Sequence, residues 1–87
     1  MKITEEELGH LQHMLGVGIH ISKRNWGYRN YFCASPEQEK EFLNLMRNGF
    51  VQIGKRDNLY VYYHATELGC VVVGLNKKQT NRALRRP

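Results

Sequence analysis

"SPEQEKEFLNLMRNGFVQIGKRDNLYVYYHA", residues 35–65, decides the fold because the spacing of its apolar residues changes halfway along. In the first half they recur at helical spacing, and in the second half they alternate as on a strand. Ser35 and Gln38 form an S-x-x-Q capping box, and Pro36 occupies the first helical position. Gly49 can adopt the left-handed conformation that ends a helix. The stretch therefore predicts a helix followed by a β-hairpin.

The hairpin consists of two strand-like runs, "FVQIGKR" and "LYVYYHA", separated by a turn at Asp57-Asn58. This turn places Lys55 and Arg56 at the tip of the hairpin. Because side chains alternate along a strand, the second run has two different faces. One face carries Tyr60, Tyr62 and His64, and the other carries Val61 and Tyr63.

Two further helices are predicted on either side of this unit. The first begins at the T-x-x-E capping box of Thr4 and Glu7 and ends near Gly16 or Gly18. The third begins at Thr66, and its apolar residues follow the i, i+3, i+4, i+7 rule. We expect these residues to form its buried face: Leu68, Val71, Val72 and Leu75.

The remaining segments carry no clear period. Residues 17–30 are predicted to be mostly loop, with a short strand or a turn of helix at its end as the alternative. Residues 77–87 are predicted to be a basic, partly disordered tail. A chain of 87 residues makes one domain, here residues 1–76. The predicted fold is a small α+β domain of helix, loop, helix, β-hairpin and short helix, followed by the tail.

The run "LMRNGFV", the hairpin and "ATELG" together resemble the junction of helix, wing and following helix in bacterial winged-helix regulators. The resemblance covers residues 36–75 and implies a winged-helix-like domain that binds DNA. A winged-helix domain usually has two closely joined helices before its wing. Here only one clear helix precedes the hairpin, and the other would have to form within residues 25–34.

The chain as a whole is similar to small proteins encoded by phages and prophages. The matching runs are "LQHMLGV", "YRNYFCASP" and "YYHATELGC". This similarity implies a phage accessory protein in a bacterial cytoplasm, and it implies no particular reaction.

The formal net charge of +5, from 13 Lys and Arg against 8 Asp and Glu, favours anionic partners. Nucleic acid, an acidic protein surface and membrane headgroups all satisfy that description. The alternative is a solvated surface that keeps the protein soluble. Under the nucleic-acid hypothesis, the loop, the second helix, the hairpin and the tail supply the phosphate contacts. The candidates are Lys23, Arg24, Arg29, Arg47, Lys55, Arg56, Lys77 and Lys78.

Aromatic residues are interleaved with cations in "SKRNWGYRNYF", residues 22–32. Such rings could stack on the bases of a single strand. A chain this short also needs large side chains to fill its core, so we expect Tyr31 and Phe32 to be buried. Trp26 should be partly exposed. The side chain of Arg29 points either out toward a phosphate or inward to a backbone carbonyl.

Catalytic and metal-binding motifs are not recognisable, so the sequence predicts no enzyme, no cofactor and no metal site. His10 and His13 are three apart on one helix but lack an H-E-x-x-H context. Cys33 lies near a helix start that could lower the pKa of its thiol, although a buried, inert thiol is the expected state. Cys70 is expected in the core. No secretory signal and no run of about 18 apolar residues is seen, so a cytosolic protein that does not span a membrane is predicted.

Two functional hypotheses follow. The first is a phage-type accessory protein that binds nucleic acid, most simply DNA, through its basic loop, wing and tail. The second is a protein-binding factor that inhibits or modulates a host protein, as inhibitors of CRISPR nucleases do. Exposed aromatics would anchor the second kind of interface, with Trp26, Tyr60 and Tyr62 as candidates. A homodimer is compatible with both hypotheses.

Overall fold

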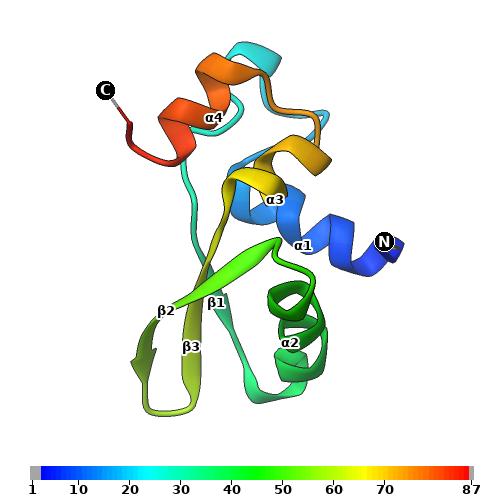
Figure 1. Cartoon of the computed structure of the whole chain (residues 1–87), viewed down its shortest axis with the longest axis vertical. Coiled ribbons are helices and arrows are strands. Elements are labelled where there is room, and N and C mark those ends of the chain that lie inside the picture. Colours follow the sequence, from blue (N-terminus) through cyan, green and yellow to red (C-terminus); the bar gives the residue numbers. More distant parts are fainter. Residues whose placement is uncertain (1–2, 87) are drawn as a thin grey trace.

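A three-stranded antiparallel sheet organises the computed structural model, which describes residues 3–86 (Figure 1). The strands lie in the order β1, β3, β2, with bounds β1 Phe32–Ala34, β2 Val51–Asp57 and β3 Tyr60–Ala65. The α-helices of the described chain are α1 Glu5–Leu15, α2 Glu39–Arg47, α3 Glu67–Val72 and α4 Lys77–Ala83. Two 3-10 turns, η1 Lys23–Asn25 and η2 Pro36–Gln38, complete the elements. The predicted small α+β domain is confirmed.

The helix boundaries follow the capping residues. The Thr4 hydroxyl accepts from the Glu7 amide at 3.0 Å, and the Glu7 carboxylate accepts from the Thr4 amide at 3.0 Å. Gly16 ends α1 with φ 70°. Gln38 Oε1 accepts from the Ser35 amide at 3.0 Å at the start of η2, which leads directly into α2. The predicted starts of the first two helices are confirmed.

Strand β1 begins two residues after the predicted loop, at whose end the sequence allowed a short strand or a turn of helix. It lies in the segment that a second winged-helix helix would need, and it pairs antiparallel with β3 through Phe32↔Tyr63, Cys33↔Tyr62 and Ala34↔Val61. Three residues are too few for a period of two to stand out, so only pairing with the central strand reveals the element. Residues 25–34 therefore contain the end of η1 and β1, and no α-helix.

The core lies between the helices and the inner face of the sheet. Phe42 of α2 is fully buried and stacks on Tyr63 of β3, with 4.6 Å between ring centroids. Alternation along the strands turns the odd-numbered residues of β3 inward. Buried aliphatic residues of α1 and α2 fill the rest of this cluster: Leu11, Met14, Leu15 and Leu45.

The expected apolar face of the third helix is wrong in part. The helix buries Gly69 and Cys70, whereas Leu68, Val71 and Val72 are 45%, 58% and 37% exposed. A methyl group at position 69 would overlap the carbonyl oxygen of Phe50, so glycine permits close approach of the two backbones. The small residues therefore face the core, and the larger ones form an exposed apolar stripe on α3. Of the four predicted residues, Leu75 alone is buried.

The segment expected to be a partly disordered tail, residues 77–87, instead forms helix α4 over residues 77–83, and its last residue lies outside the described part of the chain. Asn76 Oδ1 accepts from the Gln79 amide and Gln79 Oε1 accepts from the Asn76 amide, both at 2.8 Å. Thr80 and Ala83 are buried. The polar composition of this segment concealed its N-x-x-Q capping box. Within residues 3–86, every helix falls short of the length and hydrophobicity that crossing a bilayer requires.

Candidate nucleic-acid interface

Hydrogen bonds fix the η1 loop against α4 and so bring together cations distant in sequence. Gln79 Nε2 donates to the carbonyl of Lys23 at 2.6 Å, and Arg82 donates to the carbonyl of Arg24 at 2.8 Å. We call the end of the molecule built from η1, residue 29 and residues 77–86 the basic end. It carries eight of the chain's 13 Lys and Arg residues: Lys23, Arg24, Arg29, Lys77, Lys78, Arg82, Arg85 and Arg86.

Carboxylates are concentrated elsewhere. Residues 5–7 of α1 and residues 37, 39 and 41 of η2 and α2 hold six of the 8 acidic residues. Glu67 lies near the basic end, where its carboxylate accepts from Arg86 at 2.6 Å. Helices α2 and α4 lie at opposite ends of the long axis in Figure 1. The separated charges give the molecule a field that attracts polyanions to one end.

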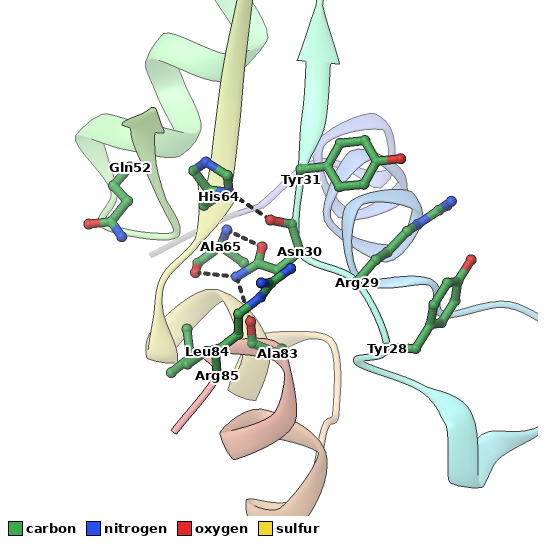
Figure 2. Close-up of a pocket in the computed structure, with 10 residues that line it drawn as sticks. All are labelled: Tyr28, Arg29, Asn30, Tyr31, Gln52, His64, Ala65, Ala83, Leu84 and Arg85. Atoms are coloured by element: carbon green, nitrogen blue, oxygen red, sulfur yellow. Dashed lines mark hydrogen bonds between the residues drawn. The ribbon is translucent and has the colours of Figure 1, made fainter. Parts of the chain in front are cut away.

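A groove of about 390 Å³ adjoins the basic end (Figure 2). Its walls come from residues 28–31, from the end of β3 and from the end of α4. The Asn30 side chain holds these three segments together: Oδ1 accepts from the Ala65 amide at 2.6 Å, and Nδ2 donates to the carbonyls of Ala65 and Ala83 at 3.1 and 3.4 Å. The polar and cationic side chains that line the groove include Tyr28, Arg29, Tyr31, Gln52, His64 and Arg85.

His64 is oriented by the same segment. Its Nδ1 lies 2.7 Å from the carbonyl oxygen of Asn30. A carbonyl can only accept, so Nδ1 carries the proton, which leaves Nε2 as the acceptor of the neutral ring. Gly54 of the neighbouring strand makes room for this ring, because a Cβ there would overlap His64 Nε2.

Arg29 points inward to a backbone carbonyl, which resolves the alternative that the sequence left open. Its Nε and Nη2 donate to the carbonyl of His13 at 3.1 and 2.7 Å, and its guanidinium carbon lies 5.4 Å from the centre of the Tyr28 ring. Arg85, at the end of α4, extends toward Asn30 (Figure 2) and is exposed. Its φ of 56° is left-handed.

The other predicted phosphate contacts do not join this group. Lys55 and Arg56 lie in β2 beside an irregularity between Ile53 and Arg56, at the hairpin end of the molecule (Figure 1). Arg56 pairs in register with Val61, whose side chain points to the inner face. Arg47 ends α2 and is exposed. The structure thus places Lys23, Arg24, Arg29, Lys77 and Lys78 on the segments that form the basic end, and Arg47, Lys55 and Arg56 on α2 and β2.

Aromatic residues of the loop are arranged differently from the prediction. Tyr31 was expected in the core but is 52% exposed, because strand alternation directs it outward and Phe32 inward. Phe32 is half-buried and lies 4.8 Å from the Phe42 ring. Trp26 is half-buried, as expected, and its Nε1 donates to the carbonyl of Ile21 at 3.2 Å. Lys23 Nζ lies 5.6 Å from the Trp26 ring centre.

The second strand has the predicted division of its faces. Tyr60 and Tyr62 point away from the core, with Tyr60 48% exposed and Tyr62 half-buried. Cys33, expected to be buried, is exposed on the same outer face opposite Tyr62. A hydrogen bond with the Cys33 side chain raises the pKa of Tyr62 above its usual value.

The cysteine and histidine side chains of the described residues lie at separate places in the fold. Cys70 is buried as predicted, and burial raises the pKa of its thiol to about 11. His10 Nε2 lies 3.3 Å from Glu41 Oε2, apart from the groove. Within residues 3–86, no three side chains of His, Cys, Asp or Glu gather closely enough to hold a metal ion.

Sequence reasoning missed several residues of the groove and the basic end. Arg82, Arg85 and Arg86 lie in the segment assigned to a partly disordered tail. Recognising the Asn76–Gln79 box would have placed Arg82 on a helix, with Arg85 and Arg86 directly after its end. The outward position of Tyr31 required knowledge of β1. Comparisons with protein-family models, with curated proteins and with solved structures found no match to this chain.

Proposed function

We propose that this chain is a small phage-type accessory protein that binds nucleic acid, DNA in the simplest case, through its basic end. The observation that carries the proposal is the joining of η1 to α4, which places two cation-bearing segments that are distant in sequence against each other. Lys23, Arg24, Lys77 and Lys78 are all exposed, so they can approach phosphates without first breaking a buried contact.

A winged-helix-like arrangement is part of the proposal. Helix α2 leads into the hairpin β2–β3, which takes the place of the wing, and α3 follows. Helix α2 exposes Glu39 beside Lys40 and is preceded by the exposed Glu37, so its surface is poorly suited to a groove lined by phosphates. We therefore assign the phosphate contacts to the basic end and not to a recognition helix.

The test compares two double variants that remove the same charge. Lys77→Ala with Lys78→Ala alters the basic end, and Lys40→Ala with Arg47→Ala alters exposed cations of α2. Fluorescence anisotropy of a labelled duplex would be followed from about 50 to 200 mM salt. We expect the first pair to lower the slope of log K against log salt by about 2 and the second pair to leave it unchanged.

Two results would contradict this assignment. Equal losses from both pairs would mean that only net charge matters, so that the basic end has no special role. No binding at about 50 mM salt, where counterion release favours association most, would exclude nucleic-acid binding.

A second candidate function is protein binding, and the exposed apolar stripe of α3 favours it. Leu68, Val71 and Val72 project from a short helix whose buried side is already filled. Under this hypothesis the stripe, or the exposed rings of Tyr60 and Tyr62, would anchor a host protein or a second copy of the chain.

Val71→Lys tests the stripe of α3 directly. We expect the parent chain to retain a partner after nuclease treatment and at high salt, and the variant to lose it, because an apolar interface depends little on ionic strength. Equal retention by the two chains would exclude the stripe as the anchor. Sedimentation of the purified parent and variant distinguishes self-association from capture of a host protein.

A further inference from the structure

The outer face of the sheet is uncovered and rich in aromatic side chains. Tyr31 and Tyr60 are about half exposed there, and Gln52 and Cys33 are exposed as well. The inner face, in contrast, holds the buried Val51, Tyr63 and Ala65. We call the outward side chains the open face: Tyr31, Cys33, Gln52, Tyr60, Tyr62 and His64.

The rings of the open face lie in a row. Tyr60, Tyr62 and His64 alternate along β3, so they recur about every 7 Å. The register Cys33↔Tyr62 and Phe32↔Tyr63 leads Tyr31 to a level beside His64. The row therefore runs from Tyr60 near the hairpin to the groove, where two rings, those of Tyr31 and His64, lie beside each other.

The charges around the row are unequal at its two ends. At the hairpin, Asp57 pairs in register with Tyr60, and Lys55 lies two residues before Asp57. Asp57 offsets Lys55, and the second cation of the hairpin, Arg56, pairs in register with Val61 of the inner face. At the groove, Arg29 and Arg85 line the same hollow as Tyr31 and His64, and none of its lining residues is acidic. A polyanion would therefore be held at the groove end, with rings extending away from it.

We propose that the open face and the groove bind single-stranded nucleic acid, with bases stacked on Tyr31, Tyr60 and Tyr62 and phosphates held by Arg85 and the basic end. This inference rests on the proposed function and names its substrate class. Stacking on rings is tolerant of sequence, since every base has a π-face. A duplex keeps its bases paired and stacked on one another, so it would contact the cations alone.

The assignment of roles follows from the contacts. The Arg29 guanidinium is already bonded to the His13 carbonyl and lies against Tyr28, so it shapes the wall of the groove. Arg85 has no hydrogen-bond or ion-pair partner for its side chain within residues 3–86, and it extends into the groove (Figure 2). Arg85 is therefore the cation available to a phosphate beside the stacked bases.

Three labelled probes of about 12 units test this without altering the protein: a single strand of thymine, the same strand with abasic sites, and a duplex. At fixed salt we expect the abasic strand, which keeps its phosphates but has no rings, to bind about 5- to 150-fold more weakly than the thymine strand for each stacked base lost. Equal affinity for these two strands would overturn the inference.

Variants of the open face give an independent measurement. Tyr31→Ala and Tyr60→Ala should each weaken binding of the thymine strand by about 5-fold or more, while Tyr31→Phe keeps the ring and should keep the affinity. Leu43→Ala removes an exposed apolar side chain from α2 and serves as the matched control. Thermal melting of each variant establishes that the binding losses come from a folded protein.

The outcomes separate this inference from the proposed function. Duplex binding that depends on Lys77 and Lys78, with no loss in the tyrosine variants, would refute the stacking platform and leave nucleic-acid binding intact. The absence of binding to all three probes would refute both. Capture of a protein partner that depends on Tyr31 and Tyr60, with no affinity for the strands, would assign the open face to protein binding and overturn the inference.

Discussion

Replacing Arg85 by glycine should stabilise the fold and weaken nucleic-acid binding. Arg85 follows α4 in a Schellman arrangement, in which the Arg86 amide donates to the carbonyl of Asn81 at 2.8 Å and the Arg85 amide donates to the carbonyl of Arg82 at 3.1 Å. Its φ of 56° is the left-handed conformation that glycine adopts freely and other residues adopt at a cost. An arginine at this position thus opposes the local backbone preference.

The size of the effect comes from two opposing terms. The left-handed conformation costs an L-residue about 1–2 kcal/mol, which glycine does not incur. Glycine loses more backbone entropy on folding than alanine does, and this loss lowers the free energy of unfolding by about 0.5–1 kcal/mol. Compared with Arg85→Ala, which removes the same charge but keeps the strain, Arg85→Gly should therefore be more stable by about 0.5–1 kcal/mol. For a domain of this size, that difference raises Tm by about 2–8 °C.

Urea denaturation and thermal melting, both followed by circular dichroism, measure the two free energies of unfolding. Anisotropy with the single-stranded probe measures binding, and both variants should lose affinity to the same extent because both lack the guanidinium. A glycine variant no more stable than the alanine variant would refute the conformational reasoning. A glycine variant that binds as tightly as the parent would remove Arg85 from the phosphate contacts.

Three further changes test the packing and the thiols. Gly69→Ala should lower the free energy of unfolding by about 1–3 kcal/mol in urea, because its methyl would overlap the Phe50 carbonyl oxygen. Asn30→Ala should cost about 1–3 kcal/mol, since it leaves backbone groups of β3 without partners, and unchanged stability would show that water replaces them. At about pH 8, a thiol reagent should modify Cys33 and spare Cys70. The pKa of Cys70 is raised to about 11, so stability should fall between about pH 9 and 11, where only the unfolded thiol ionises.

Local capping patterns predicted the first two helices well, because a cap depends only on residues three apart. The box at Thr4 marks the start of α1, the box at Ser35 marks the start of the 3-10 turn that leads into α2, and the hairpin follows from its alternation. The third helix was harder because its orientation depends on a contact between backbones. The spacing of its large residues indicated that these residues form the buried face. In the structure the buried face is that of Gly69, whose backbone lies close to the backbone of Phe50.

The site was less predictable than the fold. The cations of the site could be recognised from the sequence, but which of their segments lie next to one another in the fold could not. Lys23 and Lys77 are far apart in the chain, and their segments lie against each other because Gln79 donates to the carbonyl of Lys23. Strand β1 likewise depends on a long-range contact, because its pairing with β3 sets the outward direction of Tyr31, the residue just before it. Long-range hydrogen bonds, which leave no periodic pattern in sequence, built both parts of the candidate site.

The cations of the basic end divide into two groups by their contacts. Arg29, Arg82 and Arg86 donate to His13, Arg24 and Glu67, respectively, so they hold segments of the fold together. The side chains of the remaining five have no hydrogen-bond or ion-pair partner within residues 3–86: Lys23, Arg24, Lys77, Lys78 and Arg85. Substituting the first group disturbs the geometry of the interface as well as its charge. Substituting the second removes charge without breaking a side-chain hydrogen bond or ion pair, although Lys23 also lies over the Trp26 ring and Arg85 has a left-handed backbone. The second group is therefore the one whose losses report directly on phosphate binding, and the first explains why the loop and α4 stay together to present it.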